Sequence, residues 1–314
     1  MSGRSPAMEQ QAEEVVAANS ELTGIIPPMV TPFRDDGSID EAALRDETRY
    51  LIEAAGAHGL AVCGSTGEGH TLSTEETRLI TRVVSEESAG RIPIITGIIA
   101  NSTAAVIERG RAVADLGVAA LQVTPVHYVF RPDDDAMVRY FAEIAEATEL
   151  PIVIYNVVPW TYLSPQLLTR IIDEVPGVVG VKQSAGDMKL LADLLIMAGD
   201  RSRIMTAVDA LLYPSFALGA VGSIAAILTA APTLCVELWD AVQAGDHQRG
   251  RELHEKLLPI WNAIFADNLP ANTRYCMELQ GRFGGVPRRP MPVTSEQQKG
   301  PIRRALAAAG LIEQ

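Results

Sequence analysis

Short apolar runs alternate with amphipathic, helix-like stretches along most of this chain. The runs are rich in β-branched residues and lack a strict apolar–polar alternation, which is typical of strands buried on both faces. We therefore predict eight strands, at about residues 24–30, 59–63, 92–98, 118–124, 151–156, 178–182, 203–207 and 221–226. Helix-start signals lie between them, including a capping box of Ser73 with Glu76 and a Ser164-Pro165 pair.

Eight successive β/α units predict an α/β protein, a (β/α)8 TIM barrel with an appended C-terminal helical layer. A doubly wound sheet is the alternative, but no GxGxxG motif follows an early strand. We expect residues 1–21 to form a flexible tail, residues 22–232 the catalytic barrel, and residues 233–314 the last barrel helix and a helical extension. A proline-rich connector at 287–292 precedes the final helix, which we expect near 297–310.

Charge and composition narrow the class of protein. The net charge of −13 argues against a nucleic-acid partner, because phosphates would be repelled. Residues 210–236 lack charged side chains, but Pro214, Gly219, Gly222 and Pro232 interrupt them, so we predict buried helix and strand rather than a membrane span. Three cysteines without a CxxC pair, and an N-terminal stretch without an apolar signal-peptide core, favour a cytoplasmic protein.

Lys182 is the first candidate for chemistry. It is one of only four lysines, and it directly follows the apolar run at 178–181. Burial disfavours the ammonium form, so a lysine at the end of a buried strand is either paired or has a lowered pKa. A neutral amine at that place can form an imine with a keto acid. The alternative is a strand-end lysine that binds a carboxylate or reaches solvent.

In a barrel of this kind the active site lies at the C-terminal ends of the strands. Polar residues follow most of the predicted strands, and they would meet at this mouth: Thr31, Ser65, Thr66, Glu68, Thr124, His127, Tyr128, Tyr155, Asn156, Lys182 and Asp209. Hydroxyl groups around a lysine favour an imine-forming site. The five histidines are scattered without HxH or HExxH spacing, so we expect no metal and no cofactor.

The glycine-rich stretch at 64–69 could bind an anion through its backbone N–H groups. It lacks the lysine of a GxxxxGK[ST] loop, which argues against a nucleotide. The hydroxyl groups of Ser65 and Thr66 could instead hold a small carboxylate. A tight strand-to-helix turn without a ligand is the alternative.

Several motifs in register with the strand ends together resemble the dihydrodipicolinate synthase and N-acetylneuraminate lyase family of class I, Schiff-base aldolases. The resemblance begins near Leu22 and covers nearly the whole chain. The matching pieces are residues 24–33, Gly64-Ser65-Thr66-Gly67-Glu68, Thr71-Leu72-Ser73, Val123-Thr124-Pro125, Tyr155-Asn156-Val157, Lys182 with Ser184, Gly186 and Asp187, and Ala217-Leu218-Gly219-Ala220.

The resemblance implies a role for each matching residue. Lys182 would attack the ketone of pyruvate or another 2-keto acid, and Tyr155 would carry protons as a general acid and base. Ser65 and Thr66 would hold the keto-acid carboxylate. The catalytic candidates are therefore Lys182, Tyr155, Ser65 and Tyr128. The substrate-binding candidates are Gly64, Thr66, His127, Trp160, Ser184, Ala207, Asp209 and Ile224.

Two departures from the family pattern bear on the substrate. Trp160 stands where the synthases carry an arginine for the second substrate's carboxylate, and an indole cannot pair with a carboxylate in that way. Sialic acid lyases carry an acidic pair after strand seven, of which this chain has Asp209 but Ala210 in the second place. These departures favour a lyase, either an aldolase or a dehydratase, acting on a 2-keto-3-deoxy sugar acid or related 4-hydroxy-2-oxo acid.

Other functions stay open at this point. The chain could be a genuine 4-hydroxy-tetrahydrodipicolinate synthase or an N-acetylneuraminate lyase. A protein of another class, a non-catalytic keto-acid-binding regulatory barrel, is a further alternative. It would keep the glycine-rich loop at 64–69, which we call the carboxylate loop, but it would not need Lys182 and Tyr155 together. The resemblance further implies a homotetramer built from dimers, in which His127 or Tyr128 could join a proton relay across subunits.

Overall fold

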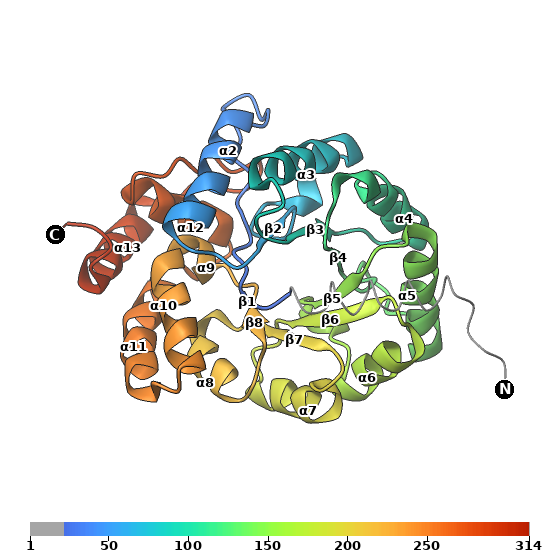
Figure 1. Cartoon of the computed structure of the whole chain (residues 1–314). Coiled ribbons are helices and arrows are strands. Elements are labelled where there is room, and N and C mark those ends of the chain that lie inside the picture. Colours follow the sequence, from blue (N-terminus) through green and yellow to red (C-terminus); the bar gives the residue numbers. More distant parts are fainter. Residues whose placement is uncertain (1–21, 314) are drawn as a thin grey trace.

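The computed structural model describes residues 22–313, and the predicted tail at 1–21 lies outside this range. The described residues form eight parallel strands within a ring of helices (Figure 1). The strands are β1 (Gly24–Ile25), β2 (Leu60–Val62), β3 (Ile94–Ile98), β4 (Ala120–Val123), β5 (Ile152–Asn156), β6 (Val178–Gln183), β7 (Arg203–Thr206) and β8 (Gly222–Ser223). This architecture confirms the α/β barrel that the sequence predicts.

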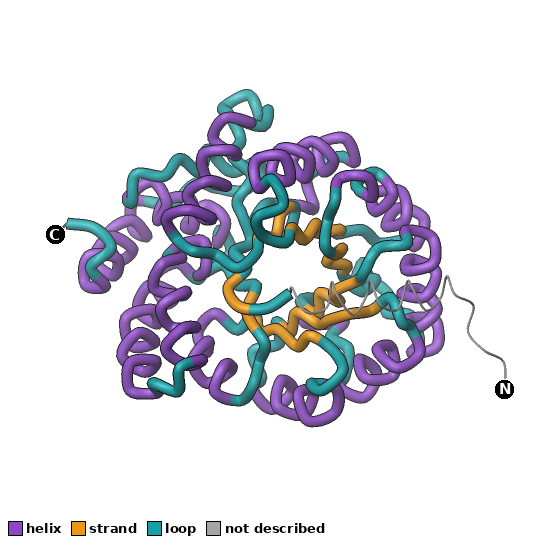
Figure 2. The backbone as a smooth tube through the Cα atoms, viewed as in Figure 1, coloured by secondary structure: helices purple, strands orange, loops and turns teal. Residues whose placement is uncertain are grey.

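The hydrogen-bonded order of the strands is β1-β8-β7-β6-β5-β4-β3-β2. The remaining gap, between β1 and β2, is bridged just beyond β1. There the Met29 N–H donates to the Ala61 carbonyl over 2.8 Å, and the Ala61 N–H donates to the Pro27 carbonyl over 3.0 Å. Figure 2 shows the strands as a central ring with the helices outside it. Because every strand has neighbours on both sides, the barrel leaves no free sheet edge.

The helices are α2 (Glu41–Arg49), α3 (Thr74–Ser88), α4 (Thr103–Arg111), α5 (Asp134–Thr148), α6 (Pro165–Glu174), α7 (Met188–Ala198), α8 (Leu212–Ala217), α9 (Ile227–Ala230), α10 (Pro232–Gln243), α11 (His247–Ile264), α12 (Leu269–Leu279) and α13 (Glu296–Ala309). The predicted capping box starts α3, where the Ser73 hydroxyl accepts from the Glu76 N–H. Ser164 caps α6, which has Pro165 in its first turn.

The barrel interior and the helix–strand layer hold separate hydrophobic clusters. The interior is filled by apolar residues that lie in the strands or directly beside them: Leu22, Ile26, Ala61, Ile95, Ala120, Val153, Val179, Met205 and Ile224. Alternate residues face outward and pack under the helices, such as Leu121 and Val123 of β4. This alternation follows from the two-residue period of a strand, and it decides which side chains reach the mouth.

The strands at the closing seam are shorter than the sequence predicts. The first was expected over 24–30 but spans only Gly24–Ile25, because Pro27 and Pro28 lack the N–H that a ladder needs. The eighth was expected over 221–226 and spans Gly222–Ser223. Helix α2 continues directly into a π-helical turn at Tyr50–Ala54.

The C-terminal helices form one cluster beside the barrel, at the left in Figure 1. Apolar residues of α10, α11 and α12 pack with Ile302 and Leu306 of α13 in a common core. The segment at 210–236, which lacks charged residues, divides into α8, β8, α9 and the start of α10. Among residues 22–313, no helix is both long enough and apolar enough to cross a membrane.

Candidate active site

The centre of the mouth is formed by Lys182 and Tyr155 on neighbouring strands. The register of β5 and β6 places these two residues directly beside each other. The Lys182 Nζ lies 3.8 Å from the centre of the Tyr155 ring, and both residues are buried. Val153 belongs to the apolar cluster inside the barrel, and its partner in β6 is Gly180. Lys182 lies two residues after Gly180, so its side chain is the next one on the inward face toward the mouth. The side chains are therefore held by strands rather than by loops.

Burial favours the neutral form of the Lys182 amine. It lowers the pKa of Lys182 to about 7, while the negative charge of Asp209 acts in the opposite direction. Among residues 22–313 the Nζ has no hydrogen bond or ion pair, and its contact is with the aromatic face of Tyr155. At neutral pH a large fraction of this amine is therefore unprotonated and free to attack a carbonyl.

Tyr155 is connected to the loop after β2. Its hydroxyl donates a hydrogen bond to Ser65 Oγ over 3.0 Å, although 90 residues separate the two in sequence. Burial raises the pKa of Tyr155 to about 12, and the bond to Ser65 opposes this shift. The phenol therefore stays protonated at neutral pH. It can give a proton to a developing alkoxide beside Lys182 and recover one through Ser65.

The loop after β2 is shaped by close backbone packing. A Cβ on Gly69 would lie 1.8 Å from the Cys63 carbonyl oxygen, and one on Gly97 would lie 2.6 Å from the same atom. Both positions therefore need glycine, and Cys63 itself has a positive φ of 57°. This packing turns the chain sharply, so that Ser65 is exposed at the mouth while Gly64 and Thr66 are buried beside it.

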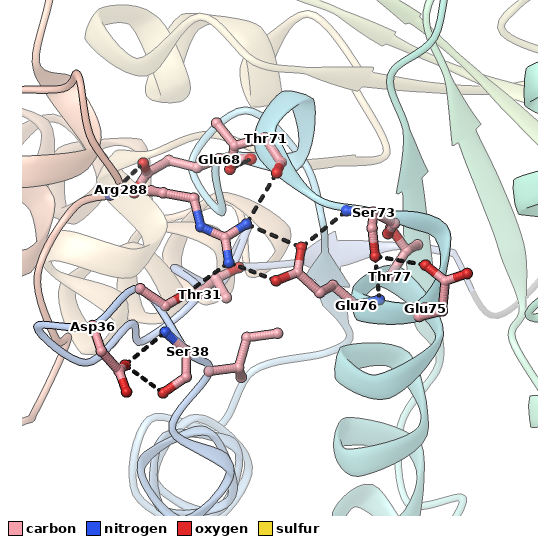
Figure 3. Close-up of polar contacts among 12 residues, drawn as sticks. Thr31, Asp36, Ser38, Glu68, Thr71, Ser73, Glu75, Glu76, Thr77 and Arg288 are labelled. Carbon is pink, nitrogen blue, oxygen red and sulfur yellow. Dashed lines mark hydrogen bonds and ion pairs between the residues drawn. The ribbon is translucent and has the colours of Figure 1, made fainter.

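A buried ion pair anchors the same loop from below. The Glu68 carboxylate lies 2.8 Å from Arg274 Nη2 and accepts the Arg288 backbone N–H over 2.9 Å. The Arg288 side chain binds Glu76 and the Thr71 carbonyl, so it joins the loop to the start of α3 (Figure 3). The exposed fractions of the Arg274 and Glu68 side chains are 4% and 0%. The loop is therefore rigidly placed by the C-terminal extension.

Asp209 is positioned just after β7. Its Oδ1 accepts the Ile227 N–H over 2.8 Å, so the carboxylate bridges the ends of β7 and β8. Burial raises the pKa of Asp209 to about 6, against the backbone hydrogen bond from Ile227 and the charge of Lys182. Its charge acts on both Lys182 and Tyr155. The carboxylate is thus an electrostatic partner of the lysine.

Three further predicted residues lie on the same side of the barrel. Ser184 directly follows β6 and its hydroxyl has no partner among residues 22–313. Ala207 follows β7, where its N–H donates to the Gln183 carbonyl. Ile224 follows β8 and belongs to the interior apolar cluster. Among residues 22–313, no hydrogen bond joins these three residues to Ser65 or Thr66.

His127, Tyr128 and Trp160 form a separate group at the rim. The Trp160 Nε1–H donates to the His127 carbonyl over 2.9 Å, which joins the loops after β4 and β5. The backbone N–H groups of His127 and Tyr128 both donate to Asn101 Oδ1. Trp160 is 70% exposed and Tyr128 is 73% exposed. Within residues 22–313 none of their side chains is hydrogen-bonded to Lys182, Tyr155 or Ser65.

Some contributors to the site were missed by sequence reasoning. Arg274 and Arg288 were not singled out, because their partner Glu68 lies more than 200 residues away, 220 in the case of Arg288. Gln122 is 1% exposed on the inward side of β4 but was hidden within a run of apolar residues. Over the described range, no cluster of histidine, cysteine and acidic residues could hold a metal ion.

Comparison with known proteins gives one consistent family. The model of the dihydrodipicolinate synthetase family matches residues 21–309. The chain is 36% identical to 4-hydroxy-tetrahydrodipicolinate synthase of Methanopyrus kandleri, over 93% of this chain and 98% of that protein.

Solved structures give the same picture. The chloride-inhibited dihydrodipicolinate synthase of Acinetobacter baumannii, complexed with pyruvate, has a TM-score of 0.88 at 31% identity, covering 93% of this chain and 100% of that one. YagE of Escherichia coli K12, also in complex with pyruvate, has a TM-score of 0.87 at 26% identity, covering 92% and 99%.

Proposed function

Because the chain belongs to the dihydrodipicolinate synthetase family, we propose that Lys182 forms an imine with pyruvate or a related 2-keto acid. The family consists of lyases of the class I aldolase type, and this chain is an enzyme of that class. The observation that carries the proposal is the buried Lys182 amine, with a pKa of about 7, beside a Tyr155 hydroxyl bonded to Ser65.

The first steps follow from the positions of these groups. The unprotonated Lys182 attacks the ketone carbon, and the carbonyl electron pair moves to oxygen, which takes a proton from Tyr155. Loss of water from this carbinolamine then gives the iminium ion. The backbone and hydroxyl groups of Gly64, Ser65 and Thr66 are suited to hold the keto-acid carboxylate, with Ser184, Ala207 and Ile224 as walls.

The iminium acts as an electron sink for the carbon next to it. If the C3–C4 bond breaks, its electron pair moves toward nitrogen and an enamine forms, while the C4 hydroxyl gives its proton to the Tyr155 phenolate and becomes an aldehyde. If the Tyr155 phenolate takes a C3 proton instead, an enamine forms, and its electron pair expels the C4 hydroxyl, which takes this proton and leaves as water. The same site thus supports either aldol cleavage or dehydration.

For the substrate we propose a 2-keto-3-deoxy sugar acid or related 4-hydroxy-2-oxo acid. Trp160 stands at the place where the resemblance expects a carboxylate-binding arginine, and its indole N–H is already used by the His127 carbonyl. Asp209 has Ala210 beside it, so the acidic pair for sugar hydroxyls is incomplete. We propose Asp209 and His127 as the polar groups that contact the distal end of this substrate.

Imine trapping tests the central step. Borohydride reduction with pyruvate should leave a stable adduct on Lys182, whereas Lys182→Met should give none. Lys189→Met is the matched control, since Lys189 is exposed and pairs with Asp193 on α7, and it should be labelled like the unaltered protein. Tyr155→Phe should slow imine formation by about 100- to 10,000-fold, the usual contribution of a general acid. Absence of an adduct would instead support a regulatory keto-acid-binding barrel.

A genuine 4-hydroxy-tetrahydrodipicolinate synthase is the second candidate, because the relative from Methanopyrus kandleri carries that name. A panel of 2-keto-3-deoxy acids, sialic acid, and pyruvate with a dicarboxylate semialdehyde separates the candidates. We expect turnover of the 2-keto-3-deoxy acids. Efficient condensation with the semialdehyde would reject our choice of substrate while leaving the imine mechanism intact.

We also propose that the enzyme is a cytoplasmic homotetramer. The rim carries neighbouring exposed apolar residues, Tyr128, Val129, Phe130 and Trp160, and such patches are usually covered by a partner. If a second copy covers them, Tyr128 comes to a subunit boundary, where it can serve the proton relay that the resemblance implies. Sedimentation analysis of the purified protein measures the assembly directly.

A further inference from the structure

Gln122 is a buried polar residue that no interaction in the fold explains. It is 1% exposed. Its Oε1 has no hydrogen-bond partner, and no hydrogen bond of its Nε2 is found among residues 22–313. Buried amide groups are nearly always hydrogen-bonded, since an unpaired one loses its bonds to water without replacement. A glutamine in this state indicates a partner that arrives with a ligand.

The register places Gln122 directly beneath the candidate site. On β4 it is two residues beyond Ala120, which belongs to the interior cluster, so it faces the barrel axis. Its partner in β5 is Val153, and Tyr155 is the next inward-facing residue toward the mouth. Gln122 therefore lies one step below the hydroxyl that we place at the reacting carbon.

The amide also lies under the carboxylate loop. A Cβ added to Gly64 would be 3.4 Å from Gln122 Nε2. On the other side, the partner of Gln122 in β3 is Gly97, which has no side chain to fill the interior. Nε2 is thus close to the backbone of the loop whose Ser65 hydroxyl is bonded to Tyr155.

We propose that Gln122 is a substrate-binding residue whose Nε2–H donates a hydrogen bond to the carboxylate of the bound 2-keto acid. This inference rests on the proposed function and deepens it. The carboxylate would be held from above by the loop at 64–66 and from below by an amide on a rigid strand. An amide donor is neutral, so it can bind the carboxylate without placing another buried charge near Lys182.

The two roles of a buried glutamine have opposite consequences for stability. Gln122→Leu removes no hydrogen bond of the folded protein, so we expect its unfolding midpoint to stay the same or to rise. Gln183→Leu is the matched control, because Gln183 is equally buried but its Oε1 accepts from the Ala185 N–H and from Asn156 Nδ2. That variant should be less stable.

The binding test compares two ketones by borohydride trapping on Lys182, pyruvate and the carboxylate-free hydroxyacetone. In Gln122→Leu, the half-saturating concentration of pyruvate should rise about 10- to 100-fold, the usual loss for a hydrogen bond to a charged group. Trapping of hydroxyacetone should not change. Gln122→Glu should weaken pyruvate further, because its charge repels the carboxylate.

The outcomes separate this inference from the proposed function. Unchanged pyruvate binding in Gln122→Leu would overturn the inference while leaving the imine mechanism standing. Equal weakening for both ketones would also overturn it, because the amide would then act on Lys182 rather than on the carboxylate. Absence of any pyruvate adduct in the unaltered protein would reject the proposed function, and with it this role of Gln122.

Discussion

Two opposing influences act on the pKa of Lys182. Burial lowers that pKa to about 7, and the charge of Asp209 raises it. Asp209 in turn has a pKa raised by burial to about 6. The lysine is therefore balanced so that its unprotonated form is available at neutral pH, whereas an exposed lysine would be almost entirely protonated there.

The pH dependence of imine formation tests this balance. The neutral amine is the nucleophile, so the rate with pyruvate should rise with pH and level off above about 7. Asp209→Asn removes the charge that raises the pKa of Lys182, and an asparagine oxygen can still accept the Ile227 N–H. The rising limb should therefore move to lower pH in this variant. Rapid trapping at a series of pH values measures the shift.

A matched control is available for this prediction. Asp133 caps α5 at an exposed position, and asparagine caps a helix about as well as aspartate. Asp133→Asn should leave the pH profile unchanged. A limb that moves to higher pH in Asp209→Asn, or does not move, would show that the charge of Asp209 does not govern Lys182.

At the scale of single residues, sequence reasoning identified polar residues at the ends of apolar runs and missed a polar residue within such a run. Lys182 and Tyr155 stood out because each is a polar residue at the end of an apolar run. Gln122 lies within such a run, where the pattern indicates only burial. Its significance depends on the absence of a partner, and only three-dimensional coordinates show that.

Among the elements, local signals were predicted better than boundaries. The Ser73–Glu76 capping box is formed as expected, because all its groups lie within four residues. The strands expected over 24–30 and 221–226 span only Gly24–Ile25 and Gly222–Ser223. The ion pairs beneath the carboxylate loop join residues about 200 positions apart, and one sequence alone cannot pair them.

The loop at 64–69 is the element whose support can be tested most sharply. Glu68→Gln leaves the buried Arg274 guanidinium without its counter-charge, and removing one member of a buried pair costs about 3–5 kcal/mol. We expect a loss of that size in the free energy of unfolding, measured with urea. Weaker binding of pyruvate should accompany it, because the loop loses its anchor.

The control uses the same substitution on the surface. Glu174 pairs with Arg170 at the end of α6, where the exposed fractions of the two side chains are 49% and 41%. Glu174→Gln should change the free energy of unfolding by about 1 kcal/mol or less, as exposed pairs do. If both variants lose the same small amount, the Glu68–Arg274 pair does not hold the loop.

Over the whole molecule, arginines of the C-terminal extension form buried ion pairs and hydrogen bonds with the barrel. Arg282 pairs with Glu47 of α2 across 235 residues of sequence, and its guanidinium also donates to the Thr229 carbonyl. Arg274 reaches the Thr31 carbonyl beyond β1, and Arg288 reaches Glu68 and Glu76. Residues after the predicted boundary at 233 therefore stabilise the loops that follow β1 and β2. The predicted boundary alone does not indicate these contacts.

The rim of the mouth carries exposed apolar side chains in the loops after β4 and β5. Tyr128, Val129 and Phe130 are 73%, 65% and 78% exposed, and Val129 has a φ of 64°. A β-branched residue in this left-handed region is strained, and such strain persists where surrounding structure enforces it. A second copy of the chain packed on this loop would supply both the cover and the constraint.

The proposed assembly makes Phe130 the residue to change. Phe130→Asp places a charge in the covered patch, so we expect sedimentation to show a smaller species than the unaltered tetramer. Phe265→Asp is the control, because Phe265 is 67% exposed at the end of α11 and stacks on Trp261 outside the patch. It should leave the assembly unchanged.

Borohydride trapping at Lys182 should persist in Phe130→Asp, since the lysine is buried within its own barrel. An unaltered mass for Phe130→Asp would show that this rim is not a subunit interface.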